Sequence, residues 1–316
     1  MLLLLGATGY IGQAFQMELT RRGERFVALS RSQVDYTRFQ PLYEYLKANK
    51  PSFVVNAAGY TGKPNVDACE SAKADTLQGN TLFLQALANA CAVLDIPFGH
   101  VSSGCIFAGA WVDYGHGWVV EKDMTKPEFK AIAANSPEKI RGFDESMIPN
   151  FSFRDQPCSF YSGTKALGEE VIEGIGSHYI WRLRVPFDEF DSARNYLSKI
   201  QRYDKIYNNF NSLSHRGDFV KACLDTWFLK APFGIYNVTN PGYVSTKQAL
   251  DLIKEALPSK RQYAFWESDS EFYNLGAVAP RSNCIMESSK LGRNGVQIRS
   301  VIDALHDSLN NWVVEH

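Results

Sequence analysis

The sequence lacks the features of several protein classes. Its 316 residues contain 33 Lys and Arg against 34 Asp and Glu, which gives a formal net charge of −1. A non-specific nucleic-acid binder needs a basic face that neutralises phosphates, so this balance argues against that class. No apolar run approaches the roughly 18 residues that a membrane-spanning helix needs. We therefore expect neither a nucleic-acid partner nor a membrane partner.

Metal-binding and disulfide patterns are also missing. The six cysteines form no C-x-x-C pair, so the sequence spells out neither a structural zinc site nor a redox motif. The histidines His100, His116, His178 and His215 share no ligand spacing, and we expect no metal. Scattered cysteines of this kind are typical of reduced thiols in a reducing compartment. The expected location is the cytoplasm.

The N-terminus, MLLLLGATGYIG, does not meet the requirements of a secretory signal. No Lys or Arg precedes Arg21, and the apolar run stops at Gly6. A short apolar run that ends at a turn residue is instead typical of a buried strand in a parallel sheet. We predict a first strand over residues 2–5.

What the sequence does contain is an alternation of apolar strands and helical patterns. Between the strands lie stretches such as residues 74–94, where Leu77, Leu84, Ala88 and Cys91 fall on one stripe of a helix. This alternation predicts an α/β fold with a doubly wound, Rossmann-like parallel sheet and helices on both faces. The expected strands are residues 2–5, 26–30, 53–58, 98–102, 179–183 and 235–238.

Two stretches depart from this rhythm. Residues 108–150 have no clean period and are rich in charge and aromatic rings, which predicts a lid or binding loop, or partial disorder. The portion from Asn240 onward predicts a smaller α-rich lobe. We divide the chain into a dinucleotide-binding domain, residues 1–185 and 205–239, and a substrate-binding lobe, residues 186–204 and 240–316.

A glycine-rich turn follows the first strand. Gly6, Gly9 and Gly12 form G-x-x-G-x-x-G, a relative of the dinucleotide-binding fingerprint. A helix that opens at Tyr10 and Ile11 would present free N–H groups to phosphates. The alternative is a merely flexible turn.

The end of the second strand predicts which dinucleotide is bound. An NAD-binding protein usually has an acidic residue there, whereas this chain has no carboxylate between Glu24 and Asp35. Ser30 and Arg31 occupy the position instead, and a guanidinium suits the 2′-phosphate of NADP. The alternative is an exposed arginine with no ligand.

A tyrosine and a lysine lie one helical turn apart. Tyr161 and Lys165 share a helix face, and an ammonium group near a phenol favours the phenolate. Ser103 stands where the strand over 98–102 ends, at the edge of the sheet where ligands bind in doubly wound folds. The Tyr/Lys spacing alone often marks a solvated helix, but with the glycine turn and the strand-end serine it predicts a dehydrogenase-type site.

With these motifs the chain resembles the extended short-chain dehydrogenase/reductases. Within them it is similar to dTDP-4-dehydrorhamnose reductase and, more closely, to the plant-type nucleotide-rhamnose synthase, a 3,5-epimerase/4-reductase. The second resemblance runs through nearly the whole chain, in GYTGKPNVDACE (59–70), GCIF (104–107), FYSGTKA (160–166), NYLSKIQRYDK (195–205), GIYNVTNPGYVS (234–245) and APRSN (279–283).

The resemblance implies a set of functional residues. The catalytic set is Ser103, Tyr161 and Lys165, and Asn80 supports it through a polar network. The substrate side comprises Ser103, Gly104, Asn195 and Arg281, with a surface charge as the alternative for Arg281. The implied cofactor-binding residues are Gly6, Gly9, Tyr10, Ile11, Gly12, Ser30, Arg31, Asn56, Ala57, Ala58, Tyr60, Asn80, Tyr161, Lys165 and Val185.

Two further residues enter through the bifunctional relatives. There, a cysteine in GCIF and a lysine in the KI-x-RY stretch are thought to move protons at carbons 3 and 5 of the sugar, and they match Cys105 and Lys199. A thiol and an amine are plausible acid/base partners for carbons beside a ketone. The alternatives are a small core cysteine and a solvated helix charge.

The resemblance thus implies an NADPH-dependent reduction of the 4-keto group of a nucleotide-linked 4-keto-6-deoxyhexose, similar to dTDP- or UDP-4-dehydrorhamnose, with 3,5-epimerisation left open. It also implies a homodimer built through helices 74–94 and 162–174. Two rival functions are a non-catalytic NADP-binding regulatory subunit and a nucleotide-sugar epimerase or dehydratase without net reduction. An insertion over 108–141, relative to the plant-type enzyme, leaves the identity of the sugar open.

Overall fold

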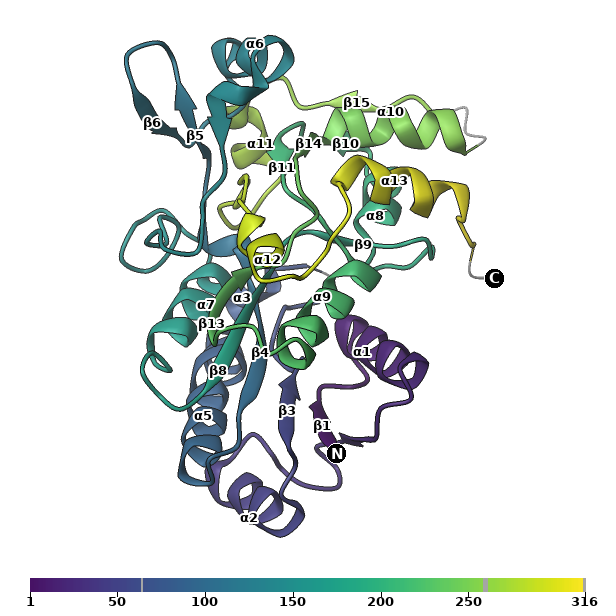
Figure 1. The fold of residues 1–316 in the computed structure, drawn as a ribbon. Helices are drawn as coiled ribbons and strands as arrows, with labels where there is room; N and C mark the ends of the chain where they lie inside the picture. Colours follow the sequence, from purple (N-terminus) through teal and green to yellow (C-terminus); the bar gives the residue numbers. More distant parts are fainter. Residues whose placement is uncertain (64, 258–260, 315–316) are drawn as a thin grey trace.

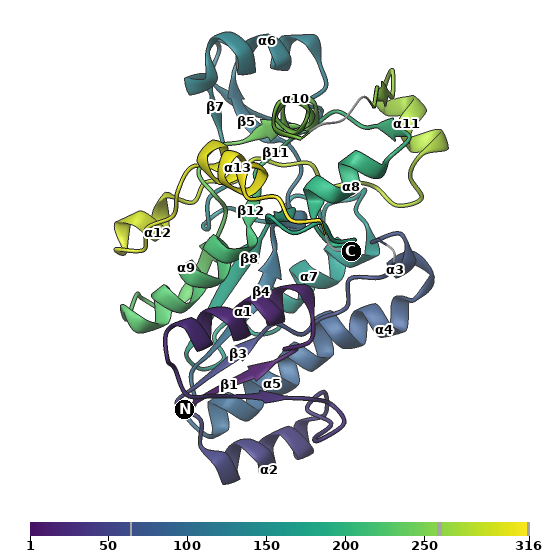
Figure 2. The ribbon, with the colours of Figure 1, turned by 90° about the vertical axis from the view of Figure 1, so that its right-hand side faces the viewer.

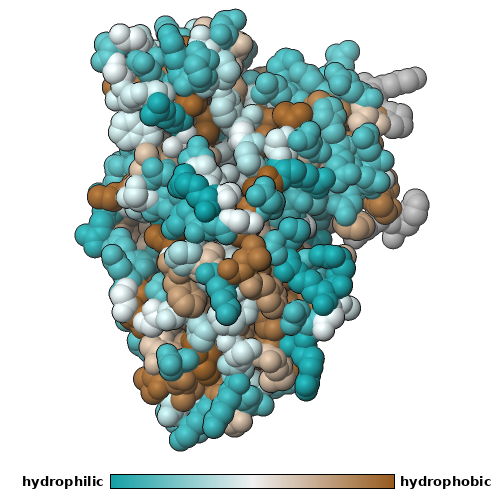
Figure 3. All heavy atoms as spheres, viewed as in Figure 1, coloured by the Kyte–Doolittle hydropathy of each residue, from teal (hydrophilic) through white to brown (hydrophobic). Residues whose placement is uncertain are grey.

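The computed structural model describes residues 1–63, 65–257 and 261–314. Its larger part is built on a parallel sheet, and a smaller lobe lies beyond one end of the strands (Figure 1). No helix in these described ranges is both long and apolar enough to cross a membrane. On the face of Figure 1, hydrophobic side chains gather in small separate groups among hydrophilic ones (Figure 3).

The main sheet has six parallel strands in the order β13-β8-β4-β3-β1-β2. All six expected strands are confirmed, with ends that differ by at most a few residues. This order places β1 between β2 and β3, which is the doubly wound arrangement expected from the alternating sequence pattern. The strands are β1 (Leu2–Leu5), β2 (Phe26–Leu29), β3 (Phe53–Asn56), β4 (Phe98–Ser103), β8 (His178–Leu183) and β13 (Gly234–Asn237).

The four leucines of β1 explain why helices cover both faces. Successive side chains of a strand point to opposite faces, so Leu2 and Leu4 join one core and Leu3 and Leu5 join the other. The first core packs beneath α1 (Tyr10–Arg21) and α9 (Arg216–Phe228), which lie side by side in Figure 2. The second core packs beneath α2 (Phe39–Asn49) and α5 (Phe83–Val93).

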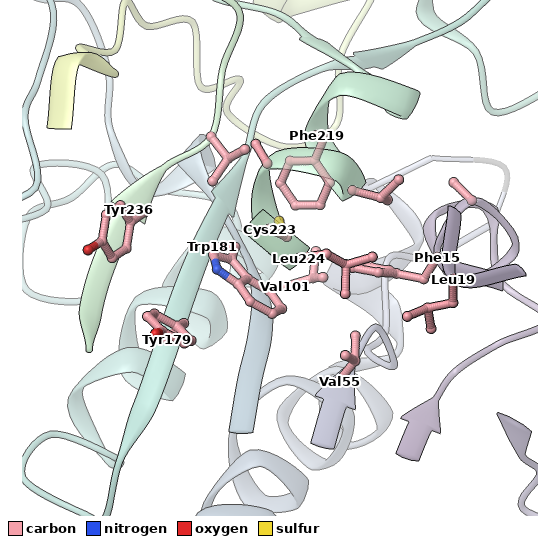
Figure 4. Packing of buried hydrophobic residues seen from close by; sticks show 14 of the residues in the cluster. Phe15, Leu19, Val55, Val101, Tyr179, Trp181, Phe219, Cys223, Leu224 and Tyr236 are labelled. Carbon is pink, nitrogen blue, oxygen red and sulfur yellow. The ribbon is translucent and has the colours of Figure 1, made fainter. Parts of the chain in front are cut away.

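The first core is dominated by aromatic rings. Trp181 of β8 is fully buried, with Phe15 of α1 at 6.1 Å between ring centroids, and Phe219 of α9 completes the group (Figure 4). Burying a large apolar side chain contributes on the order of 2 kcal/mol. These rings hold α1, and with it the glycine turn, firmly on the sheet.

The helix expected over 74–94 is interrupted. The structure has α4 (Lys73–Leu77), a π-helical segment (Gln78–Leu82) and then α5. A Cβ on Gly168 would lie 2.5 Å from the Asn80 carbonyl oxygen, so α7 (Phe160–Glu170) approaches the π segment very closely. Such π segments often occur at functional sites.

The expectation of an irregular stretch over 108–150 is wrong for most of its length. Residues 109–143 form an ordered unit, which we call the β5–β7 module, with an antiparallel sheet in the order β6-β5-β7. Its elements are β5 (Ala110–Asp113), β6 (Trp118–Glu121), α6 (Pro127–Asn135), a 3₁₀ turn (Pro137–Lys139) and β7 (Ile140–Arg141). Its core comprises Ala110, Val112, Met124, Phe129 and Ile140, with Phe210 and Ile285 from later in the chain.

The smaller lobe has its own core around three helices, α8 (Tyr196–Arg202), α10 (Thr246–Ala256) and α13 (Val301–Asn310). Short strand pairs surround it: β9 (Pro186–Phe187) with β12 (Ser214–His215), β10 (Lys205–Ile206) with β15 (Ala264–Phe265), and β11 (Phe210–Asn211) with β14 (Val244–Ser245). The remaining helices are α3 (Ala68–Ser71), α11 (Asp269–Leu275) and α12 (Ser289–Arg293).

The proposed domain division stays a prediction, and the packing departs from it in two places. Ile206 and Leu213, expected in the dinucleotide-binding domain, pack in the lobe core. Leu291 and Val296, expected in the lobe, pack in the first core of the main sheet. Residues 258–260 and 315–316 of the expected lobe lie outside the described residues.

Candidate active site

The glycine turn after β1 is closely packed. Gly6 has φ 76°, and a Cβ there would lie 2.5 Å from the Ala58 nitrogen. A Cβ on Gly12 would lie 2.0 Å from the Gly6 carbonyl oxygen, so neither position accepts a larger residue. Gly9 is exposed and begins α1 without any side-chain cap. The first-turn N–H groups at Tyr10 and Ile11 are therefore available to a phosphate.

A buried amide fixes the end of β3 beneath this turn. Asn56 accepts a hydrogen bond from the Ala58 N–H at 3.0 Å, and its Nδ2 lies 3.0 Å from Nδ1 of His100. Burial, together with the nearby charge of Lys165, lowers the pKa of His100 well below its usual value. The ring is therefore neutral. No role was expected for His100, because a histidine within a strand carries no signal of what it faces.

Asn80 holds the loop that follows β3. Its Oδ1 accepts from the Tyr60 N–H at 2.8 Å, and its Nδ2 donates to the Tyr60 carbonyl at 2.9 Å and to Thr164 Oγ1 at 3.2 Å. The π-helical segment thus connects the Tyr60 loop to α7. This is the kind of polar network that the resemblance implied for Asn80.

The end of β2 is polar and exposed. The Ser30 hydroxyl bonds to Ser32 and to Gln33. The Arg31 side chain is exposed, and its guanidinium has no hydrogen bond or ion pair within the described ranges. This cation is free to meet an anion beyond the strand.

Ser103, Tyr161 and Lys165 lie together. Ser103 ends β4, and the other two stand one turn apart on α7, whose N-terminus is capped by Ser159. All three are buried. The Ser103 side chain lies close enough to the Tyr161 phenol to lower its pKa, and the Lys165 ammonium donates to the Val101 carbonyl at 3.2 Å.

The electrostatics of this trio suit a neutral phenol. Burial raises the pKa of Tyr161, as does Cys105, while Ser103 and the Arg184 guanidinium oppose the rise. Burial lowers the pKa of Lys165 to about 8, against the opposing charge of Glu169. Lys165 was expected to favour the phenolate, but its ammonium points to a carbonyl of β4, and Arg184 is the cation that lowers the Tyr161 pKa in this structure.

A buried ion pair connects the helix that carries Tyr161 and Lys165 to the main sheet. Glu169, one turn beyond Lys165 on α7, pairs with Arg182 of β8 at 2.7 Å and accepts from the Ser102 hydroxyl at 2.5 Å. Both charged side chains are almost fully buried. Removing either partner would leave an uncompensated buried charge, so this pair ties α7 to β4 and β8.

Cys105 lies beside a buried arginine. The 3₁₀ turn Gly104–Ile106 carries it directly after Ser103, whose Oγ accepts the Cys105 N–H at 3.1 Å. Arg184 follows β8, is 2% exposed, and donates from Nη1 to the Cys105 sulfur at 2.8 Å. Arg184 was not among the expected site residues, because its partners come from distant segments of the chain.

Val185, expected near the nicotinamide, has an unusual backbone conformation. Its φ is 37°, a left-handed value that is rare for a β-branched residue. Such a conformation costs about 1–3 kcal/mol and tends to occur at functional sites. It turns the chain between Arg184 and Pro186, the first residue of β9.

The expected substrate-side residues differ in how accessible they are. Arg281 forms a bidentate ion pair with Asp67, at 2.5 and 2.7 Å, and both side chains are about one-fifth exposed. Asn195 is fully buried, caps α8 through the Leu197 N–H, and donates to Asp188. Its amide therefore holds the protein together and does not reach a substrate in this conformation.

Lys199, on α8, is partly buried. Burial and the nearby charge of Arg194 lower its pKa, and among the described residues its ammonium has no ion-pair partner. A lysine with a lowered pKa can exchange protons more readily near neutral pH. No group of His, Cys, Asp or Glu side chains in the described part of the chain could hold a metal ion.

Comparison with known proteins gives consistent matches. The family described as RmlD substrate binding domain matches residues 1–142. The bifunctional dTDP-4-dehydrorhamnose 3,5-epimerase/dTDP-4-dehydrorhamnose reductase of Arabidopsis thaliana is 30% identical over 304 residues, 96% of this chain and 90% of that protein. Trifunctional UDP-glucose 4,6-dehydratase/3,5-epimerase/reductase proteins of the same plant are 30–32% identical, and this chain spans 35–40% of their length.

Solved structures share the fold. The L780 UDP-rhamnose synthase of Acanthamoeba polyphaga mimivirus has a TM-score of 0.80 at 22% identity, over 98% of each chain. A dTDP-4-dehydrorhamnose reductase of Bacillus anthracis, solved in complex with NADP, has a TM-score of 0.74 at 19% identity, over 98% of this chain and 97% of that one.

Proposed function

The chain belongs to the family of the bifunctional dTDP-4-dehydrorhamnose 3,5-epimerase/reductase, and we propose that it reduces the 4-keto group of a nucleotide-linked 4-keto-6-deoxyhexose with NADPH. The observation that carries this proposal is the buried trio of Ser103, Tyr161 and Lys165 at the carboxyl end of β4. In doubly wound folds this edge of the sheet is where ligands bind.

The glycine turn and its surroundings fit a dinucleotide. The uncapped start of α1 and the side-chain-free Gly9 leave room and N–H donors for a diphosphate. Arg31 would meet the 2′-phosphate, and the Tyr60 loop and Val185 would border the rest of the cofactor. When bound, NADPH supplies the hydride that reduces carbon 4.

The proton comes from the protein. Because its pKa is raised, Tyr161 is a neutral phenol that can donate its proton to the alkoxide developing at carbon 4. Ser103 hydrogen-bonds the same oxygen and orients the phenol. Lys165 keeps a positive charge below about pH 8, and the Arg184 guanidinium, which lowers the pKa of Tyr161, stabilises the tyrosinate that remains.

Substrate binding involves Arg281. Its guanidinium can bind a diphosphate bidentately, but it is held by Asp67. Binding of a nucleotide diphosphate would exchange the carboxylate for phosphate oxygens. We infer that the β5–β7 module, which covers the insertion over 108–141, contributes to the choice of sugar.

Cys105 and Lys199 favour a second activity, 3,5-epimerisation before reduction. Cys105 is partly exposed and adjoins Ser103, so its sulfur belongs to the same site. The lowered pKa of Lys199 makes its ammonium a better proton donor than a solvated lysine. Together they can move protons at carbons next to the ketone.

One assay tests both activities. Purified protein is incubated in heavy water with NADPH and UDP- or dTDP-4-keto-6-deoxyglucose, while absorbance at 340 nm and deuterium at carbons 3 and 5 are followed. We expect NADPH oxidation and label at both carbons. Tyr161→Phe should slow the oxidation roughly a hundredfold or more, because it removes the general acid.

Tyr45→Phe in α2 is the matched control, because it removes a phenol far from the trio, and its rate should equal that of the wild type. Equal rates for Tyr161→Phe would refute the mechanism. Tight NADP binding without turnover would instead favour a regulatory subunit. Label without NADPH oxidation would favour an epimerase without net reduction.

A homodimer remains part of the proposal. The π segment and α5 expose Leu82 and Val93, apolar side chains that suit a helix-to-helix interface. The outer face of α7 is partly covered, since the ring of Phe153 fills the space beside Gly163. The support for a dimer therefore comes mainly from α5.

A further inference from the structure

The buried arginine beside Cys105 makes hydrogen bonds that the reduction described above does not use. Arg184 donates to the Cys105 sulfur through Nη1, and through Nη2 to Asn211 Oδ1 and to the Ser282 carbonyl. Its Nε is buried without a partner among the described residues. None of these contacts is to a carboxylate, so the positive charge of Arg184 is not neutralised by an acidic side chain bonded to it.

The groups that face the Cys105 sulfur come from three elements. Tyr161 and Lys165 of α7, Arg184 after β8 and Cys284 of the lobe all interact with it electrostatically. Burial raises the pKa of Cys284 to about 11, and Tyr161 is also neutral at pH 7. At pH 7 the cations in this set are the guanidinium of Arg184 and the ammonium of Lys165, and of these two only Arg184 bonds to the sulfur, because Lys165 donates to the Val101 carbonyl.

We propose that Arg184 is a positioning residue that holds the Cys105 sulfur as a thiolate, and thereby makes Cys105 the group that removes protons beside the substrate ketone. This rests on the proposed epimerisation. A thiolate is stabilised by a neighbouring cation and by N–H donors. Arg184 supplies both, and Asn211 and Ser282 fix its orientation.

In the proposed epimerisation, Cys105 removes a proton from the sugar and Lys199 supplies one. The C–H bond next to the ketone breaks, its proton passes to the Cys105 thiolate to form S–H, and the electron pair moves to the keto oxygen as an enolate. Lys199 then gives a proton to the same carbon and is left as a neutral amine. Exchange with solvent returns the thiolate and the ammonium, and no oxidant or reductant is consumed.

The first test needs no substrate. Alkylation by iodoacetamide is followed against pH, with the peptides containing Cys105 and Cys158 quantified separately by mass spectrometry. Cys158 is also partly exposed, and burial raises its pKa, which makes it an internal control. We expect Cys105 to react at least about tenfold faster than Cys158 at pH 7, because only the thiolate is nucleophilic.

Replacement of Arg184 should remove this difference. In Arg184→Gln the pH midpoint of Cys105 alkylation should rise by about one unit or more, a tenfold change in the thiolate fraction, while that of Cys158 stays in place. Arg184→Lys should restore most of the reactivity. If Arg184→Gln does not fold, the proposal is tested by the reactivity of Cys105 in Arg184→Lys and by the ratio of the Cys105 and Cys158 alkylation rates in the wild type. Equal rates for the two cysteines in the wild type would overturn the proposal.

The second test follows deuterium uptake at carbons 3 and 5 from heavy water, without NADPH. Uptake by Arg184→Gln should fall about a hundredfold at pH 7 and recover in part at higher pH, as expected of a base whose ionisation has been displaced. A merely structural role would lower uptake equally at all pH values, which would contradict the inference. Failure of the wild type to reduce any keto-sugar would instead refute the proposed function and leave the alkylation result standing.

Discussion

Arg31 is the side chain that bears most directly on cofactor choice. It is exposed at the end of β2, and within the described residues no carboxylate pairs with it. The absence of an acidic residue between Glu24 and Asp35 already predicted NADP from sequence. A free guanidinium at this edge of the sheet supports that prediction with a physical reason, because a dianionic 2′-phosphate would be its natural partner.

We predict that Arg31→Ala raises the KM for NADPH roughly ten- to hundredfold, since a hydrogen bond to a charged group contributes about 1.5–3 kcal/mol. The KM for NADH should be unchanged. Steady-state kinetics with both cofactors measures this. Arg25→Ala is the matched control, because Arg25 is an exposed arginine before the opposite end of the same strand; an equal effect of both substitutions would show only a general loss of positive charge.

At the scale of single residues, the spacing of neighbouring residues along a helix could be predicted from the sequence. Contacts between residues far apart in the sequence could not. The four-residue spacing of Tyr161 and Lys165 predicted a shared helix face, and α7 has it. The partners of Arg184 lie 27 to 98 residues away in sequence, apart from any motif. Asn195 is a second example. The resemblance implied a substrate-binding residue, but the burial of its amide could not be predicted from the sequence.

At the scale of elements, the β5–β7 module differs most from what the sequence suggested. Its strands have two to four residues, too few for a hydrophobic period to emerge. Its core closes only with Phe210 and Ile285, which lie far along the chain. The strands of the main sheet are hardly longer, but they are apolar runs that alternate with helical patterns, and all six were predicted closely.

We predict that Phe129→Ala destabilises the module by about 3–5 kcal/mol, the usual cost of removing a buried phenylalanine ring. Phe129 is fully buried and packs 5.3 Å from Phe210 between ring centroids. Hydrogen exchange should accelerate over residues 110–141 and change little in β1 or β3. The exposed neighbour Lys130, changed to Ala, serves as the control, and indistinguishable exchange in the two variants would contradict the packing described.

At the scale of the whole molecule, one buried network joins the two parts. Arg216, at the start of α9, donates to the Tyr10 carbonyl of the glycine turn at 2.8 Å and pairs with Asp188 at 2.8 Å. Asp188 also accepts from Asn195, the cap of α8. The glycine turn is thereby connected to the helix that carries Lys199.

We predict that Asp188→Asn lowers the free energy of unfolding by about 3–5 kcal/mol, because it leaves the Arg216 charge buried without its partner. Urea denaturation measures the change. Asp191→Asn, three residues along the same loop, breaks a largely exposed pair with Arg202 and should cost less than about 1 kcal/mol. Similar losses in the two variants would show that burial of the Asp188 pair has no energetic consequence.

The path of the chain through the β5–β7 module also affects how the protein is made. Gly109 bridges to Cys284, and Phe143 bridges to Met286. A ribosome adds about 5–20 residues each second, so Met286 is synthesised roughly 7 to 30 s after Phe143. During that interval Phe129 and its neighbours have no cover from the C-terminal third. The nascent chain is therefore most vulnerable to aggregation and to chaperone capture at the β5–β7 module.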